Sequence, residues 1–216
     1  GFYVAVGYKT NKKDATNLTK KNPAIAIQVD VSSRKSIKKS IQSCKKFFGQ
    51  NIDVLINNAA ISQEKSFEKI SDADWDHMLV SNLRGVFSFS QEVIPYMIKN
   101  GWGRIINIAS IGGQWGGRNQ IHYAASKAGL INLTLSLAKL YSKKGITTNA
   151  VSPGLVKTDL VANELKTSAG KNKVKQIPIG RIASTNEIAD IVNFLCSDQA
   201  SYITGQTINA NGGMYP

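Results

Sequence analysis

The sequence predicts a single-domain α/β protein in which helices cover both faces of a doubly wound, Rossmann-like parallel sheet. Two observations support this fold. Apolar, strand-forming runs alternate with segments of helical periodicity along the chain, which is typical of a parallel sheet between two layers of helices. The length of 216 residues suits one such domain, and neither a linker nor an internal repeat divides residues 1–216.

Strands are expected in the short apolar runs that lack a helical period. Because each run lies beside a segment with helical periodicity, the strands should run parallel and be joined by helical crossovers. The predicted strands are Phe2–Tyr8, Ala24–Asp30, Ile52–Asn57, Arg104–Ser110, Thr147–Ser152 and Thr207–Asn209.

Helices are predicted between these strands, and two of them begin at a serine. Ser71 with Asp74 resembles a capping box with the shorter acid, and Ser184 with Glu187 matches the complete motif. The predicted helices cover residues 14–21, 34–48, 71–100 and 119–142, and a last one starts at residue 184.

The segment 159–178 is rich in lysine and has no clear period. A long insertion of this kind in a compact domain is usually functional or mobile. Its position predicts a substrate lid at the carboxyl ends of the strands, where open α/β sheets bind ligands. An ordinary surface loop with short helical pieces is the alternative.

The chain carries a net charge of +13, which raises the question of an anionic partner. Its lysines are spread along the sequence with few aromatic residues among them, so solvated helix faces are the simplest explanation. An acidic protein partner or an anionic substrate is the alternative, and nucleic-acid binding is not expected as the main function.

Other composition features exclude several classes. No run of eighteen apolar residues is present, so no membrane span is predicted. Cys44 and Cys196 lie in helical patterns without metal-ligand neighbours, which indicates thiols in a reducing, cytoplasmic compartment. His77 and His122 are too far apart for a convincing metal site, so no metal is expected.

A tyrosine and a lysine four residues apart form a candidate acid–base pair. Tyr123 and Lys127 share one face of a predicted helix, and a nearby ammonium favours the ionised form of a phenol. Ser110 ends a strand thirteen residues earlier, where its hydroxyl can hold a substrate carbonyl. A serine before glycines is also common in simple turns.

Small or polar residues follow other predicted strands. The sequence Asn57-Asn58-Ala59-Ala60 ends the third strand, and small side chains there let a cofactor approach the backbone. Asp30 closes the second strand, where a carboxylate can accept a hydrogen bond from an adenine amino group. Asn82 lies within a predicted helix, where asparagine is a poor helix former and can bond a carbonyl or a water.

Taken in order, these residues resemble the classical short-chain dehydrogenase/reductase family over the whole chain. Within this family the chain looks most like the 3-oxoacyl-acyl-carrier-protein reductases and the acetoacetyl-CoA reductases. The resemblance is carried by Asp30, Asn57-Asn58-Ala59-Ala60, Asn82, Ser110, Tyr123-x-x-x-Lys127, Pro153-Gly154 and Thr158, with the tail segments 202–206 and 211–215.

The resemblance implies an oxidoreductase that uses a nicotinamide cofactor. Tyr123 would donate a proton to the substrate carbonyl, Lys127 would lower the tyrosine pKa and hold the nicotinamide ribose, and Ser110 would polarise the carbonyl. Asn82 would hold a water in a proton relay. The implied cofactor-binding residues are Asp30, Val31, Asn58, Ala59, Ala60, Tyr123, Lys127, Pro153, Gly154, Val156 and Thr158.

The segment that begins at Tyr8 and Lys9 bears on the choice of cofactor. NAD enzymes of this kind usually place an acid after the second strand of the fold, and this segment has none before Asp14. Its cations suit a ribose 2′-phosphate instead. We therefore expect NADP(H) bound with the help of Tyr8 and Lys9, with NAD(H) the less favoured cofactor.

The expected reaction is the reduction of a 3-oxoacyl thioester, linked to an acidic acyl carrier protein or to CoA, by a homotetramer or homodimer. The alternatives are a dehydrogenase for another alcohol, sugar or steroid, and a non-catalytic relative. Two features depart from the family pattern: Ala60 replaces a glycine, and the first strand with its glycine-rich turn is absent. We expect the natural chain to be longer by one βα unit.

Overall fold

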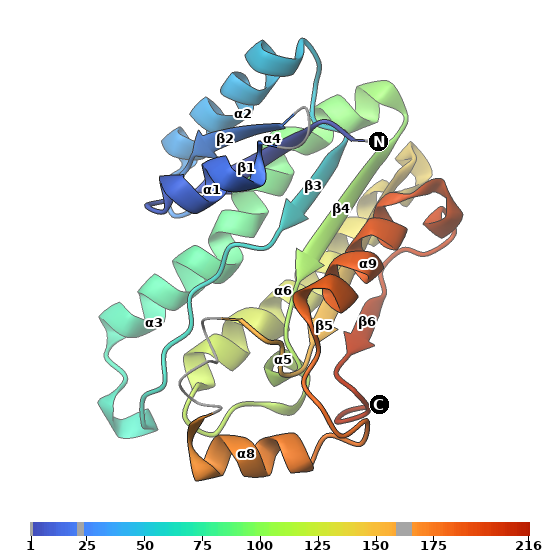
Figure 1. The fold of residues 1–216 in the computed structure, drawn as a ribbon. Helices are drawn as coiled ribbons and strands as arrows, with labels where there is room; N and C mark the ends of the chain where they lie inside the picture. The colour runs from blue at the N-terminus through green and yellow to red at the C-terminus, as the bar shows by residue number, and fades with distance from the viewer. Residues whose placement is uncertain (1, 21–23, 159–165) are drawn as a thin grey trace.

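The computed structural model describes residues 2–20, 24–158 and 166–216, and its strands all pair in parallel (Figure 1). One sheet of four strands has the order β3-β4-β5-β6, and a second sheet joins β1 to β2. The strands are β1 (Val4–Tyr8), β2 (Ala24–Gln28), β3 (Val54–Asn57), β4 (Gly103–Ile108), β5 (Ile146–Pro153) and β6 (Thr207–Ala210).

In the described part of the chain, the strands β1 and β3 do not pair with each other, so the parallel strands form two separate sheets. β1 pairs only with β2, and β3 only with β4, so each strand keeps one edge without a strand partner in the described part of the chain. Apolar side chains beside this break are exposed to solvent: Tyr3 to 62%, Val4 to 43% and Ile56 to 47%. The two sheets are therefore pieces of one layer rather than a continuous sheet.

Two hydrophobic clusters hold helices against opposite faces of the sheet. Alternate residues of β4 point to opposite faces, so Ile105 joins one cluster and Ile106 the other. The first cluster contains side chains of α2 (Arg34–Phe48), α4 (Gly85–Asn100) and α6 (Ile121–Tyr141), and it extends from the four-stranded sheet to Val29, which follows β2. The second is covered by α9 (Thr185–Cys196).

The long helix predicted for residues 71–100 is divided by a π-helical turn. It consists of α3 (Asp72–Leu79), a π-helix η2 (Val80–Arg84) and α4. Single π turns in helices are often found at functional sites. The predicted caps are confirmed, because both hydrogen bonds of the capping box form at Ser71 and at Ser184.

The other predicted elements are present with shifted ends. The predicted strand Arg104–Ser110 ends two residues earlier, at Ile108, which places Ser110 in the following turn. The lid segment contains a helix, α8 (Ser168–Lys175), where the sequence analysis allowed only short helical pieces as the alternative. Residues 159–165 of this segment lie outside the described part of the chain. The remaining elements are α1 (Lys12–Leu18), η1 (Phe67–Lys69), α5 (Gly112–Trp115), η3 (Ser142–Lys144), α8 (Ser168–Lys175) and η5 (Asp198–Ala200).

The described residues contain neither a candidate membrane span nor a candidate metal site. No helix in them is long and apolar enough to cross a membrane. No group of three or more His, Cys, Asp or Glu side chains in them is arranged to hold a metal ion.

Candidate active site

The fold brings Ser110, Tyr123 and Lys127 together at the carboxyl end of β4. Tyr123 and Lys127 lie one turn apart in α6, and Ser110 is in the turn between β4 and α5. The Ser110 hydroxyl accepts a hydrogen bond from the Gly112 amide at 3.1 Å and forms a second bond with the Tyr123 phenol. Lys127 Nζ lies 5.7 Å from the centre of the tyrosine ring. The predicted triad is therefore assembled.

Burial controls the protonation of this triad. It raises the pKa of the Tyr123 phenol, which the hydrogen bond with Ser110 partly opposes. It lowers the pKa of Lys127 to about 8, because the lysine is only 3% exposed. The ammonium donates a hydrogen bond of 2.7 Å to the Ile108 carbonyl. The phenol is therefore protonated at neutral pH in this arrangement, and the expected lowering of the tyrosine pKa by Lys127 stays a prediction.

Asn82 connects α6 to the loop that follows β3. Its side chain accepts a hydrogen bond from the Ile61 amide and donates to the Ile61 carbonyl, both at 2.9 Å. Its amide also donates to Ser126 Oγ at 3.2 Å, and Ser126 belongs to α6. The side chain of Asn82 thus positions two segments of the site, and its role in a water relay stays a prediction.

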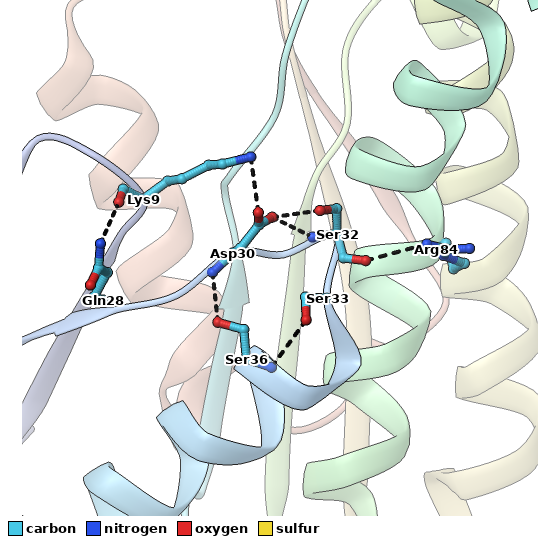
Figure 2. Close-up of polar contacts among 7 residues, drawn as sticks. All are labelled: Lys9, Gln28, Asp30, Ser32, Ser33, Ser36 and Arg84. Atoms are coloured by element: carbon cyan, nitrogen blue, oxygen red, sulfur yellow. Dashed lines mark hydrogen bonds and ion pairs between the residues drawn. The ribbon is translucent and has the colours of Figure 1, made fainter. Parts of the chain in front are cut away.

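A second group of polar residues lies where β1 and β2 end (Figure 2). The carboxylate of Asp30 pairs with Lys9 at 3.1 Å and accepts hydrogen bonds from the amide and hydroxyl of Ser32 at 2.9 and 2.6 Å. These bonds, led by that of the Ser32 hydroxyl, lower the pKa of Asp30 to about 2. Asp30 is therefore an anion with a fixed orientation next to a cation.

The turn at Val31 packs closely against the first residue of α4. A Cβ on Gly85 would lie 2.8 Å from the Val31 carbonyl oxygen, so only glycine allows this approach. Arg84, the last residue of the π-helix, donates to the Ser32 carbonyl at 3.2 Å (Figure 2). The sequence analysis did not identify Arg84 as a site residue, and nothing in its local pattern distinguishes it from the other basic residues.

The remaining predicted cofactor residues lie at the same edge of the sheet. Asn58, Ala59 and Ala60 follow β3 and are exposed. Pro153 ends β5, and Gly154 is the next residue. Gly154 lies so close to the C-terminal segment that a Cβ on it would be 3.0 Å from Asn211 Cα. Val156 bridges to Ala183, Thr158 is exposed, and Tyr8 closes β1 next to Lys9.

The donor set fits a nicotinamide dinucleotide at its two ends. Asp30 and Val31 would hold the adenine, the residues after β3 its ribose, and Lys127 with the turn after β5 the nicotinamide ribose and ring. Residues 1–216 contain no glycine-rich turn to hold the pyrophosphate. The fit is therefore good for the adenosine and nicotinamide portions and leaves the central phosphates without a cradle.

A Rossmann-like sheet with a half-buried tyrosine, a buried lysine and a serine at one strand end is typical of dinucleotide-dependent oxidoreductases. Comparison with known proteins identifies the family. A family model described as enoyl-(acyl carrier protein) reductase matches residues 1–215. The chain belongs to the short-chain dehydrogenase/reductase family and is an NAD(P)-dependent oxidoreductase.

Among its relatives are several enzymes named 3-oxoacyl-(acyl-carrier-protein) reductase FabG. That of Staphylococcus epidermidis is 40% identical over 220 residues, which cover the whole of this chain and 89% of the relative. That of Aquifex aeolicus is 42% identical over 89% of this chain and 77% of its own length. That of Buchnera aphidicola is 46% identical over 83% of this chain and 72% of its own length.

Proposed function

We propose that this protein reduces a 3-oxoacyl thioester to the 3-hydroxyacyl thioester with NADPH. The observation that carries the proposal is the assembly of Ser110, Tyr123 and Lys127 around one point at the end of β4. The substrate class comes from the names of relatives that are 40–46% identical to this chain. Other short-chain carbonyl compounds are the alternative substrates.

The proposed chemistry divides between the cofactor and the chain. Bound NADPH supplies the hydride that the carbonyl carbon accepts. The Ser110 hydroxyl holds and polarises the carbonyl oxygen, and Tyr123 gives it a proton. Burial suits this role, because the raised pKa of Tyr123 keeps the phenol protonated at neutral pH. Lys127, charged below its pKa of about 8, would attract negative charge that develops on the phenol oxygen.

The end of β1 supports a preference for NADP(H). Lys9 is a partly exposed cation at this position, held 3.1 Å from Asp30. The first acid after β1 is Asp14, whose carboxylate is bonded by the Asn11 amide in the first turn of α1. A ribose 2′-phosphate placed here would meet Lys9 together with Lys12 and Lys13, and no free acid precedes them.

A carrier-linked substrate is consistent with the charge of the chain. The net charge of +13 suits an acidic acyl carrier protein as the partner that presents the thioester. We propose a homotetramer or homodimer as the active assembly. Two buried free thiols, Cys44 and Cys196, favour a reducing compartment such as the cytoplasm.

We also propose that a further parallel strand fills the break between β1 and β3 in the active enzyme. Two strand edges without partners and exposed apolar residues beside them, Tyr3, Val4 and Ile56, support this step. A glycine-rich turn after such a strand would also provide the missing pyrophosphate cradle. Residues 159–178 are proposed as the substrate lid.

The test follows NADPH absorbance with acetoacetyl-CoA as substrate, for residues 1–216 and for the same chain extended by an upstream βα unit with a glycine-rich turn. Oxidation by the extended chain that is lost in Tyr123→Phe is the expected result. Activity of residues 1–216 alone would contradict the need for the added strand. NADPH binding without turnover would overturn the thioester as substrate, and no NADPH binding by either form would overturn the enzymatic proposal.

A further inference from the structure

The helix that carries Tyr123 begins without a side-chain cap. α6 starts at Ile121, and the side chain of the preceding Gln120 makes no capping hydrogen bond. Tyr123 is the third residue of this helix and lies in its first turn, where backbone amides have no partner within the helix. In the proposed reaction Tyr123 must meet both Ser110 and the substrate carbonyl. Contacts from outside the helix therefore have to fix this turn.

The loop that follows β3 supplies two such contacts. His122 is fully buried, and its Nε2 lies 2.9 Å from Oε1 of Gln63 in this loop. Two residues further along, the Lys65 amide donates a hydrogen bond of 2.8 Å to the Asn119 carbonyl, just before α6. The loop is therefore bonded to the chain on both sides of the residue at which α6 starts.

A charged group fixes the direction of the hydrogen bond between His122 and Gln63. The Gln63 amide nitrogen donates to Oδ1 of Asp74 at 3.1 Å, so the amide oxygen is turned toward the imidazole. Asp74 also bonds Lys65 Nζ at 2.6 Å, and this bond, followed by those from Ser71, holds the pKa of the carboxyl well below its usual range. Since the Asp74 anion only accepts hydrogen bonds, the imidazole donates its Nε2–H to Gln63 Oε1.

The other imidazole nitrogen shows that His122 does more than fill space. Nδ1 is buried and has no hydrogen-bond partner among the described residues. A buried polar ring with an unpaired nitrogen costs free energy that an apolar ring of similar size, such as that of phenylalanine, does not. Packing alone therefore gives no reason for an imidazole at this position, whereas the hydrogen bond to Gln63 does.

We propose that His122 and Gln63 are positioning residues that hold the first turn of α6, and with it Tyr123, against the loop after β3. This inference rests on the proposed function. The same loop is fixed at its start by Asn82, which bonds both backbone groups of Ile61. The loop is thus tied to the π-helix at one end and to α3 and α6 at the other. A small displacement of the phenol lowers the rate of proton transfer more than it lowers binding, because the transfer needs a close, aligned approach.

The test measures kcat and KM for acetoacetyl-CoA and the Kd of NADPH, in the form of the enzyme that turns over this substrate. Gln63→Met keeps the length of an exposed side chain and removes the acceptor, and His122→Phe keeps a ring and removes the donor. Each should lower kcat about ten-fold while the Kd of NADPH changes less than about two-fold. His122→Gln, which keeps an N–H donor, should recover most of the lost kcat. Equal losses in NADPH binding and kcat would overturn the proposal.

The double variant separates one shared hydrogen bond from two independent effects. If both side chains act through the same bond, Gln63→Met combined with His122→Phe should lose no more activity than either single variant. A loss of about a hundred-fold, the product of two ten-fold effects, would show that the two residues act separately and would overturn the proposal.

The matched control is Thr134→Val in the same helix. Thr134 is fully buried, and its hydroxyl accepts from Asn107 at 2.9 Å and donates to the Leu130 carbonyl at 2.8 Å. This change removes buried hydrogen bonds from α6 eleven residues beyond Tyr123, so it should lower thermal stability and leave kcat unchanged. A ten-fold loss of kcat in Thr134→Val as well would overturn the proposal, since a general loosening of α6 would then explain every variant.

A second readout does not require turnover. Hydrogen–deuterium exchange of peptides that cover residues 61–66 and 119–126 should be at least about three-fold faster in Gln63→Met than in the wild type, with residues 130–141 unchanged. If kcat is intact in both single variants, the positioning role is wrong while the reductase stands. If the wild type does not turn over acetoacetyl-CoA, the proposed function fails, and unchanged exchange in Gln63→Met would then overturn the link between loop and helix as well.

Discussion

The buried Lys127 gives a quantitative prediction for stability against pH. Its pKa is lowered from 10.5 to about 8 by burial, so the unfolded chain binds this proton more tightly than the native protein does. Stability therefore rises with pH between about 8 and 10.5, where the unfolded state still holds the proton. From these two values the lysine makes the native state about 2 kcal/mol more favourable at pH 9.5 than at pH 7.

The perturbation is Lys127→Met, which keeps the length of the side chain and removes the charge. At pH 7 the buried ammonium costs about 3 kcal/mol, whereas the lost hydrogen bond to Ile108 is worth roughly 1–3 kcal/mol. The variant should therefore be as stable as the wild type or slightly more stable, while its reductase activity is lost.

The assay is urea unfolding of both proteins at pH 7 and pH 9.5. The unfolding free energy of the wild type minus that of Lys127→Met should be about 2 kcal/mol larger at pH 9.5 than at pH 7. Lys139→Met, which removes an exposed lysine from the same helix, should leave the pH dependence as it is in the wild type. A difference between wild type and Lys127→Met that stays constant with pH would refute this reasoning.

Three further predictions concern single side chains. Asn82→Ala should lower the unfolding free energy by about 2–4 kcal/mol, because this buried side chain loses its hydrogen bonds with the Ile61 backbone and with Ser126; a urea midpoint equal to that of the wild type would contradict this. Gly145→Ala should destabilise the protein by at least about 2 kcal/mol more than Gly180→Ala. Both glycines have φ near +78°, but only a Cβ on Gly145 would clash, at 1.9 Å from a backbone oxygen. Equal losses of thermal stability would show that the clash relaxes. Lys9→Glu should reduce the ratio of kcat/KM for NADPH over NADH at least about ten-fold, and an unchanged ratio would place the 2′-phosphate elsewhere.

Much of the fold could be predicted because its signals are local. Strand and helix periods extend over a few residues, and capping boxes such as those at Ser71 and Ser184 need only four. The elements that the sequence analysis missed lack such signals. α5 contains two glycines in four residues, and α8 lies in a lysine-rich segment with a glycine inside it. The π turn at Val80–Arg84 leaves no mark on the periodicity of the long helix.

Contacts across long sequence separations could not be predicted. Arg84 meets Ser32 from 52 residues away, and Asn82 meets Ser126 from 44. These pairs depend on how closely two helices and a turn pack, which in turn depends on glycines such as Gly85. The same limit applies to His122, whose partner Gln63 is 59 residues away in the sequence.

The order and spacing of the chemical groups could be predicted from local sequence: a serine after a strand, and a tyrosine and a lysine four residues apart on one helix face. Spacing along a helix is fixed by local geometry. The electrostatic state of these groups depends on the folded protein, since desolvation depends on every neighbour that excludes water. Burial raises the pKa of Tyr123 and lowers that of Lys127, the reverse of the mutual effect expected from the pair alone.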